Sequence, residues 1–347
     1  MNEITKITLI VLAVPVFLFI LFYLLTMGVS VAETVEQDPS IPHVTIDGVT
    51  FHAETFGNPE NPIVIVVHGG PGNDYRGLLA LQALADEYYV VFYDQRGTGL
   101  SPRVSAEELT FDLTVSDLNL IVDYISGGEK VNLVGHSFGG MIVSPYLGKY
   151  PEKVDHVILS EPGFLSTETA MMWMSWWQSI TTKPRSFNFR LNSVKTWFEN
   201  LHITGPDEQA KADHAYHNFG LSIDGKPGQA EYYCNGEYAA GKPTYWRSSA
   251  LASQSIQDLT QTSEFIYFDS EGNLQFNLTK GVENFTNKVL FIASECNTVI
   301  GTEVQSIHMT YFPNAELAVI DGAGHDMYSG KPEETIAVIR EYLNTPQ

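Results

Sequence analysis

The stretch Val131-Asn-Leu-Val-Gly-His-Ser-Phe-Gly-Gly140 is the most informative part of this chain, because an apolar strand runs directly into the pattern Gly-x-Ser-x-Gly. In this pattern the serine sits on a strained strand-to-helix turn, and glycines on either side leave room for a backbone that side chains would block. Gly135 and Gly139 occupy those two positions. The motif therefore predicts Ser137 as a catalytic nucleophile at the start of a helix.

Two further segments supply candidates for the rest of a hydrolytic site. Ile63-Val-Ile-Val-Val-His-Gly-Gly-Pro-Gly72 is an apolar run that ends in glycines, and Asp321-Gly-Ala-Gly-His-Asp326 follows a strand-like run late in the chain. A loop of the first kind supplies one backbone N–H of an oxyanion hole, and the residue after the nucleophile supplies the other. We expect Gly70 and Phe138 to be these donors and His325 to be the general base.

Four motifs together point to a known family. They are His68-Gly-Gly-Pro-Gly72, Asp94-Gln-Arg-Gly-Thr-Gly-Leu-Ser101, the serine turn and Gly322-Ala-Gly-His325. With the serine before the histidine, they resemble the proline iminopeptidase branch of the α/β-hydrolase superfamily. The match covers residues 44 to 161 and 286 to 345. The resemblance implies an α/β-hydrolase fold and an aminopeptidase that removes N-terminal residues, proline among the candidates, from short peptides without a cofactor.

Strand and helix patterns set the expected domain organisation. They alternate as far as Glu161-Pro-Gly163 and resume at Lys288-Val-Leu-Phe-Ile-Ala293. Such alternation predicts a mostly parallel sheet with helices on both faces. We therefore expect an α/β core in two parts, residues 44–161 and 287–347. Residues 162–286, rich in aromatic side chains, are expected to form a mainly helical cap inserted after the sixth strand.

The acid of the predicted triad departs from the family pattern. Relatives carry an aspartate a few residues beyond the seventh strand, where this chain has Asn297, and an amide cannot stabilise an imidazolium as a carboxylate does. Glu161 ends the sixth strand and resembles the acid of haloalkane dehalogenases in position. Glu295 is the rival, although neighbouring strand residues alternate faces and would turn it away from His325. We expect Glu161 to be the acid; Glu295 and the absence of any acid remain alternatives.

The N-terminal segment is predicted to lie outside this fold. Ile7–Met27 is almost unbroken in apolar residues and is long enough to cross a bilayer as one helix. Residues 1–6 are then expected in the cytoplasm, residues 28–43 form a linker, and the catalytic domain is extracytoplasmic. Ser30-Val-Ala32 also fits a signal-peptide cleavage site, which would give a secreted or periplasmic enzyme. We favour an uncleaved anchor because the apolar run exceeds a usual signal core.

The charge of the chain restricts its partners. There are 19 basic and 41 acidic residues, for a net charge of −22, which disfavours nucleic acid and anionic lipid headgroups. The expected partner is a small peptide or ester substrate. Glu231 and Glu237 are candidates for binding a substrate amino group, because related iminopeptidases use cap glutamates for this; a solvated cap surface explains them nearly as well. An esterase or lactonase, or a catalytically silent ligand-binding homologue, is the alternative.

Several other polar residues are expected to be structural. His68 and His136 should hydrogen-bond the loops in which they lie, and Asp94 and Arg96 should form an ion pair. His214-Ala-Tyr-His217 has no further ligand at suitable spacing, so we expect no metal site.

The chain has two cysteines, Cys234 in the predicted cap and Cys296 beside the expected acid position. A disulfide between them would tie the cap to the core, whereas two buried thiols are the alternative. Spacing along the sequence does not decide between the two.

Overall fold

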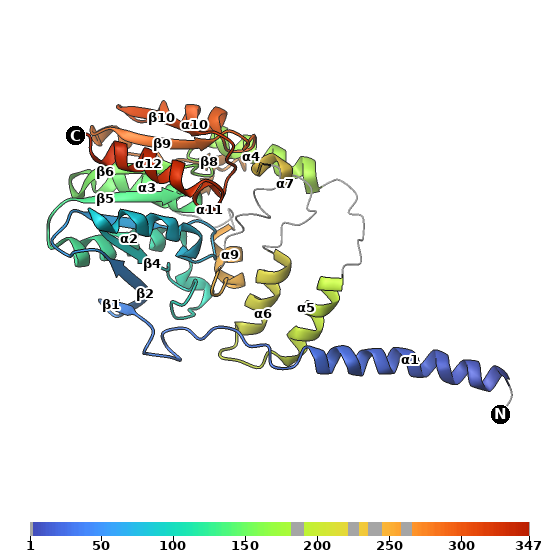
Figure 1. Ribbon diagram of the computed structural model, residues 1–347. Helices are drawn as coiled ribbons and strands as arrows, with labels where there is room; N and C mark the ends of the chain where they lie inside the picture. The colour runs from blue at the N-terminus through green and yellow to red at the C-terminus, as the bar shows by residue number, and fades with distance from the viewer. Residues whose placement is uncertain (1–2, 182–190, 221–228, 235–244, 258–265, 347) are drawn as a thin grey trace.

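One large sheet forms the centre of the computed structural model, with helices on both of its faces (Figure 1). The structure describes residues 3–181, 191–220, 229–234, 245–257 and 266–346. In chain order the eight strands of the sheet are β1 (His43–Ile46), β2 (Val49–Phe56), β3 (Ile63–Val67), β4 (Tyr89–Tyr93), β5 (Val131–His136), β6 (Val154–Ser160), β9 (Val289–Ser294) and β10 (Ala315–Ile320). They lie in the order β1-β2-β4-β3-β5-β6-β9-β10.

The sheet is mostly parallel. Strand β2 pairs antiparallel with β1 and with β4, and all other neighbouring strands run parallel. Asp47 and Gly48 make the β1–β2 turn with positive φ angles, which match a tight hairpin. Every residue of β3, β5 and β9 is buried, as expected for parallel strands covered on both faces. The predicted α/β fold is therefore confirmed.

Alternate side chains of β3 divide the core into two layers. Ile65 and Val67 pack into one apolar cluster, and Val64 and Val66 pack into the other. This two-sided burial is why the strand reads as a continuous apolar run. The helices are α2 (Phe111–Ser126), α3 (Phe138–Lys149) and α10 (Thr302–Met309) on the first face, η1 (Tyr75–Asp86), α11 (Met327–Gly330) and α12 (Pro332–Leu343) on the second, and the short 3₁₀ turns η2 (Ala106–Glu108) and η3 (Pro151–Lys153).

A long insertion separates β6 from β9. Its described part is mainly helical but also contains a small antiparallel hairpin. The spacing of apolar residues in the sequence did not predict this hairpin. The boundaries 162–286 of the cap remain a prediction. The elements of the insertion are α4 (Thr167–Thr181), α5 (Leu191–His202), α6 (Ala210–Ala215), the π-helical turn η4 (Tyr216–Gly220), α7 (Gln229–Tyr232), α9 (Ala250–Gln257), β7 (Ile266–Phe268), β8 (Leu274–Phe276) and η5 (Val282–Asn284).

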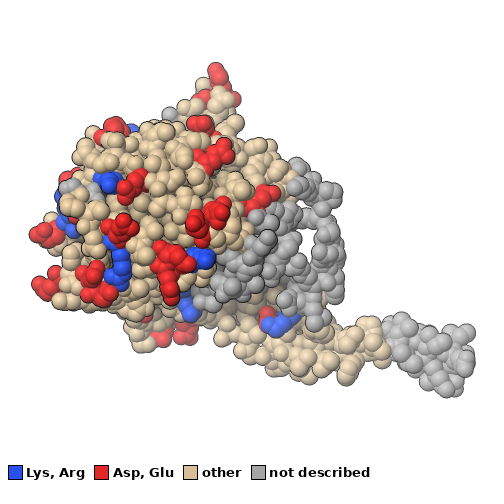
Figure 2. Space-filling view, turned by 45° about the horizontal axis from the view of Figure 1, so that its top comes forward, with Lys and Arg blue, Asp and Glu red and all other residues tan. Residues whose placement is uncertain are grey.

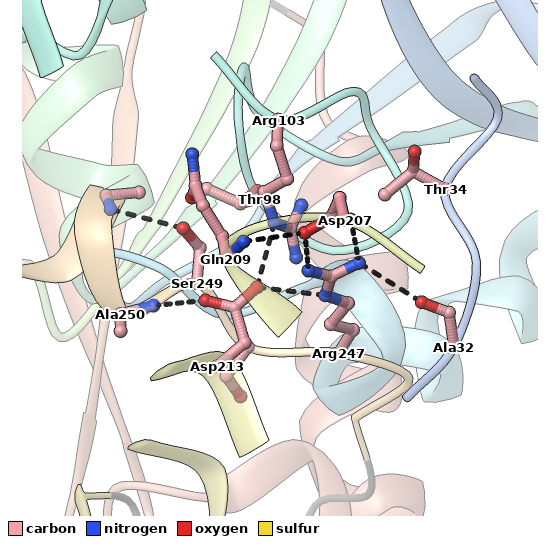
Figure 3. Close-up of polar contacts among 12 residues, drawn as sticks. Ala32, Thr34, Thr98, Arg103, Asp207, Gln209, Asp213, Arg247, Ser249 and Ala250 are labelled. Carbon is pink, nitrogen blue, oxygen red and sulfur yellow. Dashed lines mark hydrogen bonds and ion pairs between the residues drawn. The ribbon is translucent and has the colours of Figure 1, made fainter. Parts of the chain in front are cut away.

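A buried cluster of charges attaches the insertion to the core (Figure 3). Asp213 of α6 accepts hydrogen bonds of 2.9 Å from the Nε atoms of both Arg103, in a core loop, and Arg247, before α9. Arg247 also pairs with Asp207 at 2.6 Å and donates to the carbonyl of Ala32 at 3.2 Å. Since every charge has an opposite partner, the cost of burial is offset, and the cluster ties linker, core and insertion together.

The N-terminal helix α1 (Glu3–Leu25) projects away from the sheet and lies beside α5 at its C-terminal end (Figure 1). Phe19 and Phe22 pack against Phe198 of α5, with ring centroids 5.1 and 5.5 Å apart. Within the described part of the chain, no helix is both long and apolar enough to cross a membrane. The predicted transmembrane anchor is therefore wrong, and the C-terminal part of the apolar run contacts α5. The membrane-anchored, extracytoplasmic location inferred from it is withdrawn.

Candidate active site

Ser137 lies on the sharp turn between β5 and α3. Its backbone has φ 54° and ψ −121°, and its N–H donates to the carbonyl of Ser160 at 3.0 Å. A side chain on Gly139 would place its Cβ 2.0 Å from the carbonyl oxygen of Val67, and one on Gly135 would meet the backbone of α3 at 2.9 Å. Both glycines are therefore required by close backbone packing, which in turn holds the serine in its strained conformation.

Ser137, His325 and Glu161 form a continuous hydrogen-bonded line. Nε2 of His325 lies 3.0 Å from Oγ of Ser137, and Nδ1 of His325 lies 2.7 Å from Oε2 of Glu161. Glu161 is fully buried at the end of β6, whereas the imidazole is 12% exposed. This geometry allows the imidazole to accept a proton from the serine while it donates to the carboxylate. Three loops that are remote in sequence thus meet at the carboxyl edge of the sheet.

The carboxylate of Glu161 is surrounded by donors. One oxygen, Oε1, accepts from both the N–H, at 2.7 Å, and the hydroxyl of Ser294. The other, Oε2, accepts from Nδ2 of Asn297 at 2.7 Å and faces His325. A buried carboxylate is costly unless its oxygens are paired. These contacts stabilise its negative charge and fix its orientation toward the imidazole.

Glu295 and Asn297 have other partners in the loop after β9. Glu295 accepts a hydrogen bond of 2.7 Å from the N–H of Gly322. Asn297 accepts at Oδ1 from the N–H groups of Val299 and Ile300, at 3.0 and 3.1 Å. The geometry thus favours Glu161 over Glu295 as the acid. From the sequence, Asn297 was interpreted only as the absence of the usual acid. The hydrogen bond from its Nδ2 to the carboxylate of Glu161 was not predicted.

The predicted oxyanion donors are Phe138, directly after the serine, and Gly70, in the loop after β3. Phe138 is the first residue of α3, where backbone N–H groups have no acceptor inside the helix. Gly70 lies in the loop after β3 with φ 137°. The neighbouring Gly69, which the sequence did not single out, is packed against the nucleophile: a Cβ at Gly69 would lie 2.9 Å from Cβ of Ser137. The loop after β3 therefore comes closest to the serine at Gly69, where a side chain larger than hydrogen would clash.

Two buried histidines support the site. His68 Nδ1 lies 2.8 Å from the carbonyl of Gly69, and its Nε2 accepts from the N–H of Gln95 at 3.1 Å. His136 Nδ1 lies 3.1 Å from the carbonyl of Ser160, and its ring is 4.7 Å from that of His325. Burial lowers the pKa of His68, and burial together with the nearby imidazole lowers the pKa of His136 well below its ordinary value. The prediction that each ring hydrogen-bonds its own loop is confirmed for His68, whereas His136 contacts the neighbouring strand β6 instead.

The predicted ion pair between Asp94 and Arg96 is wrong. Asp94 is fully buried and contacts His52 at 2.7 Å, while Arg96 pairs with Asp117 of α2 at 2.6 Å. Asp94 also accepts from the backbone N–H of Leu100, which closes the loop after β4 around it. Its carboxylate is therefore turned inward, whereas the arginine extends toward the helix.

The segment Glu231–Cys234 of the insertion reaches the catalytic histidine candidate. The carbonyl of Tyr232 accepts from the N–H of His325 at 2.9 Å, and the two rings lie 5.4 Å apart. The carboxylate of Glu231 accepts from the indole N–H of Trp176. Glu237, the second candidate for binding an amino group, lies outside the described residues. Glu231 is thus next to the residue that contacts His325, while its own carboxylate contacts Trp176.

The two cysteines are bonded to each other. The Cα atoms of Cys234 and Cys296 are 5.1 Å apart, within the range for a disulfide. Of the two alternatives left open by the sequence, the structure contains the bridge. It joins the insertion to the residue that precedes Asn297.

The histidines of the 214–217 pattern have separate partners. His214 Nδ1 lies 3.2 Å from Oδ1 of Asn200, and His217 Nδ1 lies 3.1 Å from the hydroxyl of Ser248. In the described ranges, no group of three or more histidine, cysteine, aspartate or glutamate side chains is arranged to hold a metal ion.

Comparisons with known proteins agree with this geometry. Residues 62–332 match the family model described as alpha/beta hydrolase fold. The chain is 27% identical to a proline iminopeptidase of Heyndrickxia coagulans over 285 residues, 81% of this chain and 90% of that protein. It is 24% identical to the proline iminopeptidase PfmaB of Pestalotiopsis fici over 311 residues, 87% and 99% of the two chains. The resemblance to the proline iminopeptidase-like branch is therefore confirmed.

The fold is also found among solved structures. The proline iminopeptidase-related protein of Thermus thermophilus superposes with a TM-score of 0.55 at 19% identity. The match covers 87% of this chain and 96% of that one. At this identity the likeness concerns the fold alone.

Proposed function

Since the chain belongs to the α/β-hydrolase family, we propose that it is a serine hydrolase that removes N-terminal residues, proline among them, from short peptides. The observation that carries the proposal is the line from Ser137 through His325 to Glu161, with contacts of 3.0 and 2.7 Å. A nucleophile, a base and an acid within hydrogen-bond reach of one another are what acyl transfer requires.

The acylation step follows from this arrangement. Nε2 of His325 takes the proton from Ser137 as Oγ attacks the scissile carbonyl carbon. The resulting oxyanion is held by the backbone N–H groups of Gly70 and Phe138, and each such donor contributes about 3 to 4 kcal/mol in the transition state. Glu161 stabilises the imidazolium. The histidine then gives its proton to the leaving amine as the C–N bond breaks.

Deacylation uses the same groups in reverse order. Water replaces the leaving amine, His325 removes its proton, and the resulting hydroxide attacks the ester carbonyl on Ser137. The tetrahedral intermediate collapses when the imidazolium returns its proton to Oγ of the serine. The residues named and one water molecule complete the cycle, so the proposal includes no cofactor.

The choice of a peptide with a free amino terminus rests on two observations. The relatives reported above are named proline iminopeptidases. The chain carries a net charge of −22, and acidic side chains are spread over the visible face of the core (Figure 2). Such a field attracts a cationic amino group. Glu231, and Glu237 outside the described residues, are the proposed carboxylates for this amine.

A paired assay tests the proposal. Proline arylamide should be hydrolysed, N-acetylation of a matched peptide should suppress its turnover strongly, and Ser137→Ala should abolish both activity and labelling by a fluorophosphonate probe. Equal rates on free and acetylated peptides, with faster turnover of short acyl esters, would contradict the aminopeptidase proposal and favour an esterase or lactonase. A folded protein that neither reacts with the probe nor turns over any of these substrates would be a ligand-binding homologue.

A further inference from the structure

We propose that the segment Glu231–Cys234 is a clamp on the catalytic loops, and that its closure by the Cys234–Cys296 disulfide places hydrolysis under thiol redox control. The inference rests on the proposed roles of Ser137 and His325 and adds the regulation of their site. The segment comes from the insertion, yet its contacts join the loop that carries Asn297 to the loop that carries the histidine.

The backbone of the clamp bridges these two loops. The carbonyl of Glu231 accepts from the N–H of Thr298 at 2.8 Å and from its hydroxyl at 3.2 Å. The next carbonyl, of Tyr232, accepts from the N–H of His325 at 2.9 Å. Two successive carbonyls therefore fix the separation of the loop that carries Asn297 and the loop that carries His325. A displacement of either loop alters the contact between His325 and Glu161.

The side chain of Tyr232 orients the imidazole as well. Its ring meets that of His325 at an interplanar angle of 68°, and its hydroxyl accepts from the indole N–H of Trp173 in α4 at 2.9 Å. Tyr232 does not contact the reacting atoms in the proposed mechanism. It is therefore a positioning residue that acts through the histidine, and Trp173 holds its hydroxyl.

The disulfide closes the clamp next to the acid. Cys296 directly precedes Asn297, whose amide donates to Glu161, and the N–H of Cys296 donates to the carbonyl of Ala323 in the histidine loop at 2.9 Å. The covalent bond thus holds the clamp at the point where both loops meet. Without it, hydrogen bonds to the carbonyls of Glu231 and Tyr232 remain, and each contributes only modestly in partly exposed surroundings.

The redox step is an ordinary exchange. A dithiol reductant transfers two electrons and two protons to the bridge, so that Cys234 and Cys296 become thiols and the reductant becomes a cyclic disulfide. Both cysteines are only partly buried, which leaves the bridge within reach of a small reagent. Because the sequence has two cysteines in all, any effect of a thiol reagent on this protein acts through this bond.

The test compares fluorophosphonate labelling of the oxidised, reduced and reoxidised full-length protein, with thiol titration to verify each state. Reduction should slow labelling about tenfold or more, because a displacement of about 1 Å can cost about 10²-fold in rate. Reoxidation should restore the rate. Cys234→Ser and Cys296→Ser should be labelled slowly whether or not the dithiol is present, while near-ultraviolet circular dichroism reports that the tertiary fold persists.

Substitutions of the tyrosine separate positioning from folding. Tyr232→Phe keeps the ring and the carbonyl but loses the hydrogen bond from Trp173, so it should be labelled more slowly than the wild-type protein and faster than Tyr232→Ala. With a reporter substrate, reduction should lower kcat and leave KM unchanged. Equal labelling rates in the oxidised and fully reduced protein would overturn the clamp alone. No labelling of the oxidised protein would overturn the proposed function and the clamp with it.

Discussion

Asn297 donates a hydrogen bond of 2.7 Å to Oε2 of Glu161, the same oxygen that lies 2.7 Å from Nδ1 of His325. The amide stands where the family resemblance places the acid, and it donates to Glu161, the proposed acid, at the end of the neighbouring strand. A donor is the group that a buried carboxylate needs at this point. The two departures from the family pattern, an amide after β9 and a glutamate after β6, are thus in direct hydrogen-bond contact.

Asn297→Asp alone should impair the enzyme, although it restores the residue that relatives carry. The new carboxylate would face Glu161 in place of a donor, and two like charges at this distance cannot both remain ionised without cost. We expect kcat/KM to fall about tenfold or more, since each loss of about 1.4 kcal/mol of transition-state stabilisation lowers the rate about tenfold. Steady-state kinetics measures the effect; an unchanged or higher kcat/KM would show that the amide has no supporting role.

The same contact predicts a charge swap. Glu161→Gln should lower kcat by about 10⁴, the cost of the corresponding acid-to-amide change in serine proteases. The double variant Glu161→Gln/Asn297→Asp should be more active than Glu161→Gln, because it returns one carboxylate to the side of His325 and keeps an amide opposite it. Glu295→Gln is the matched control and should be mild, since that carboxylate contacts Gly322. A double variant no better than Glu161→Gln would contradict the swap.

Gly69→Ala should inactivate the enzyme while the fold persists. The added methyl would lie 2.9 Å from Cβ and 3.5 Å from Oγ of Ser137, so it would displace the nucleophile or fill the space of the attacked carbonyl. We expect hydrolysis and fluorophosphonate labelling to fall together by about 10²-fold, as for a displacement of about 1 Å at a reacting centre. Thermal unfolding serves as the control for folding. Near wild-type labelling of the variant would show that the loop adjusts without cost.

The sequence predicted the features that are encoded locally. Buried strands such as Ile63–Val67 read as apolar runs because both faces are covered, and the turn at Ser137 needs glycine at fixed positions beside it. Glu161 was also predicted as the acid, from its place at a strand end. The structure places it 2.7 Å from His325, which supports that expectation.

What the sequence did not predict depends on contacts between distant segments. The donation from Asn297 to Glu161 joins residues 136 positions apart, and the alternation of side chains along a strand carries no information about it. The pairing of Arg96 with Asp117 rather than Asp94 depends on how α2 packs beside the loop. The apolar residues at the N-terminus match a membrane span by composition, whereas Phe19 and Phe22 pack on a helix from a distant part of the chain.

Asp213→Asn should destabilise the attachment of the insertion. The carboxylate accepts from Arg103, Arg247 and the N–H of Ala250, and its side chain is 1% exposed. Loss of its charge leaves two buried guanidinium groups short of a counterion, which typically costs about 3 to 5 kcal/mol. Urea denaturation should show this decrease in the free energy of unfolding. The exposed pair of Lys331 and Glu334 is the control, and Lys331→Gln should change stability by less than about 1 kcal/mol.

His308 should make the stability of the protein depend on pH below neutrality. The ring is fully buried, and its Nε2 atom lies 3.2 Å from the N–H of Leu165 and 3.1 Å from the hydroxyl of Thr169, at the start of the insertion. Burial lowers the pKa of His308 to about 3, whereas an unfolded histidine titrates near 6.5. Between these values the unfolded chain binds the additional proton, so the free energy of unfolding decreases as the pH falls from about 6.5 toward 3.

His308→Gln, which keeps polar contacts without a titrating ring, should flatten this dependence. If the unfolded chain binds one more proton than the folded protein, the free energy of unfolding falls by about 1.4 kcal/mol per pH unit. As the pH is lowered from about 6.5 to about 4, the wild-type protein should therefore lose up to this much more stability per pH unit than the variant. Urea denaturation across this range measures both curves, and His43→Gln on the exposed part of β1 is the matched control. Parallel curves for His308→Gln and the wild-type protein would mean that the buried ring is already protonated in the folded state, or that the site admits the charge without cost.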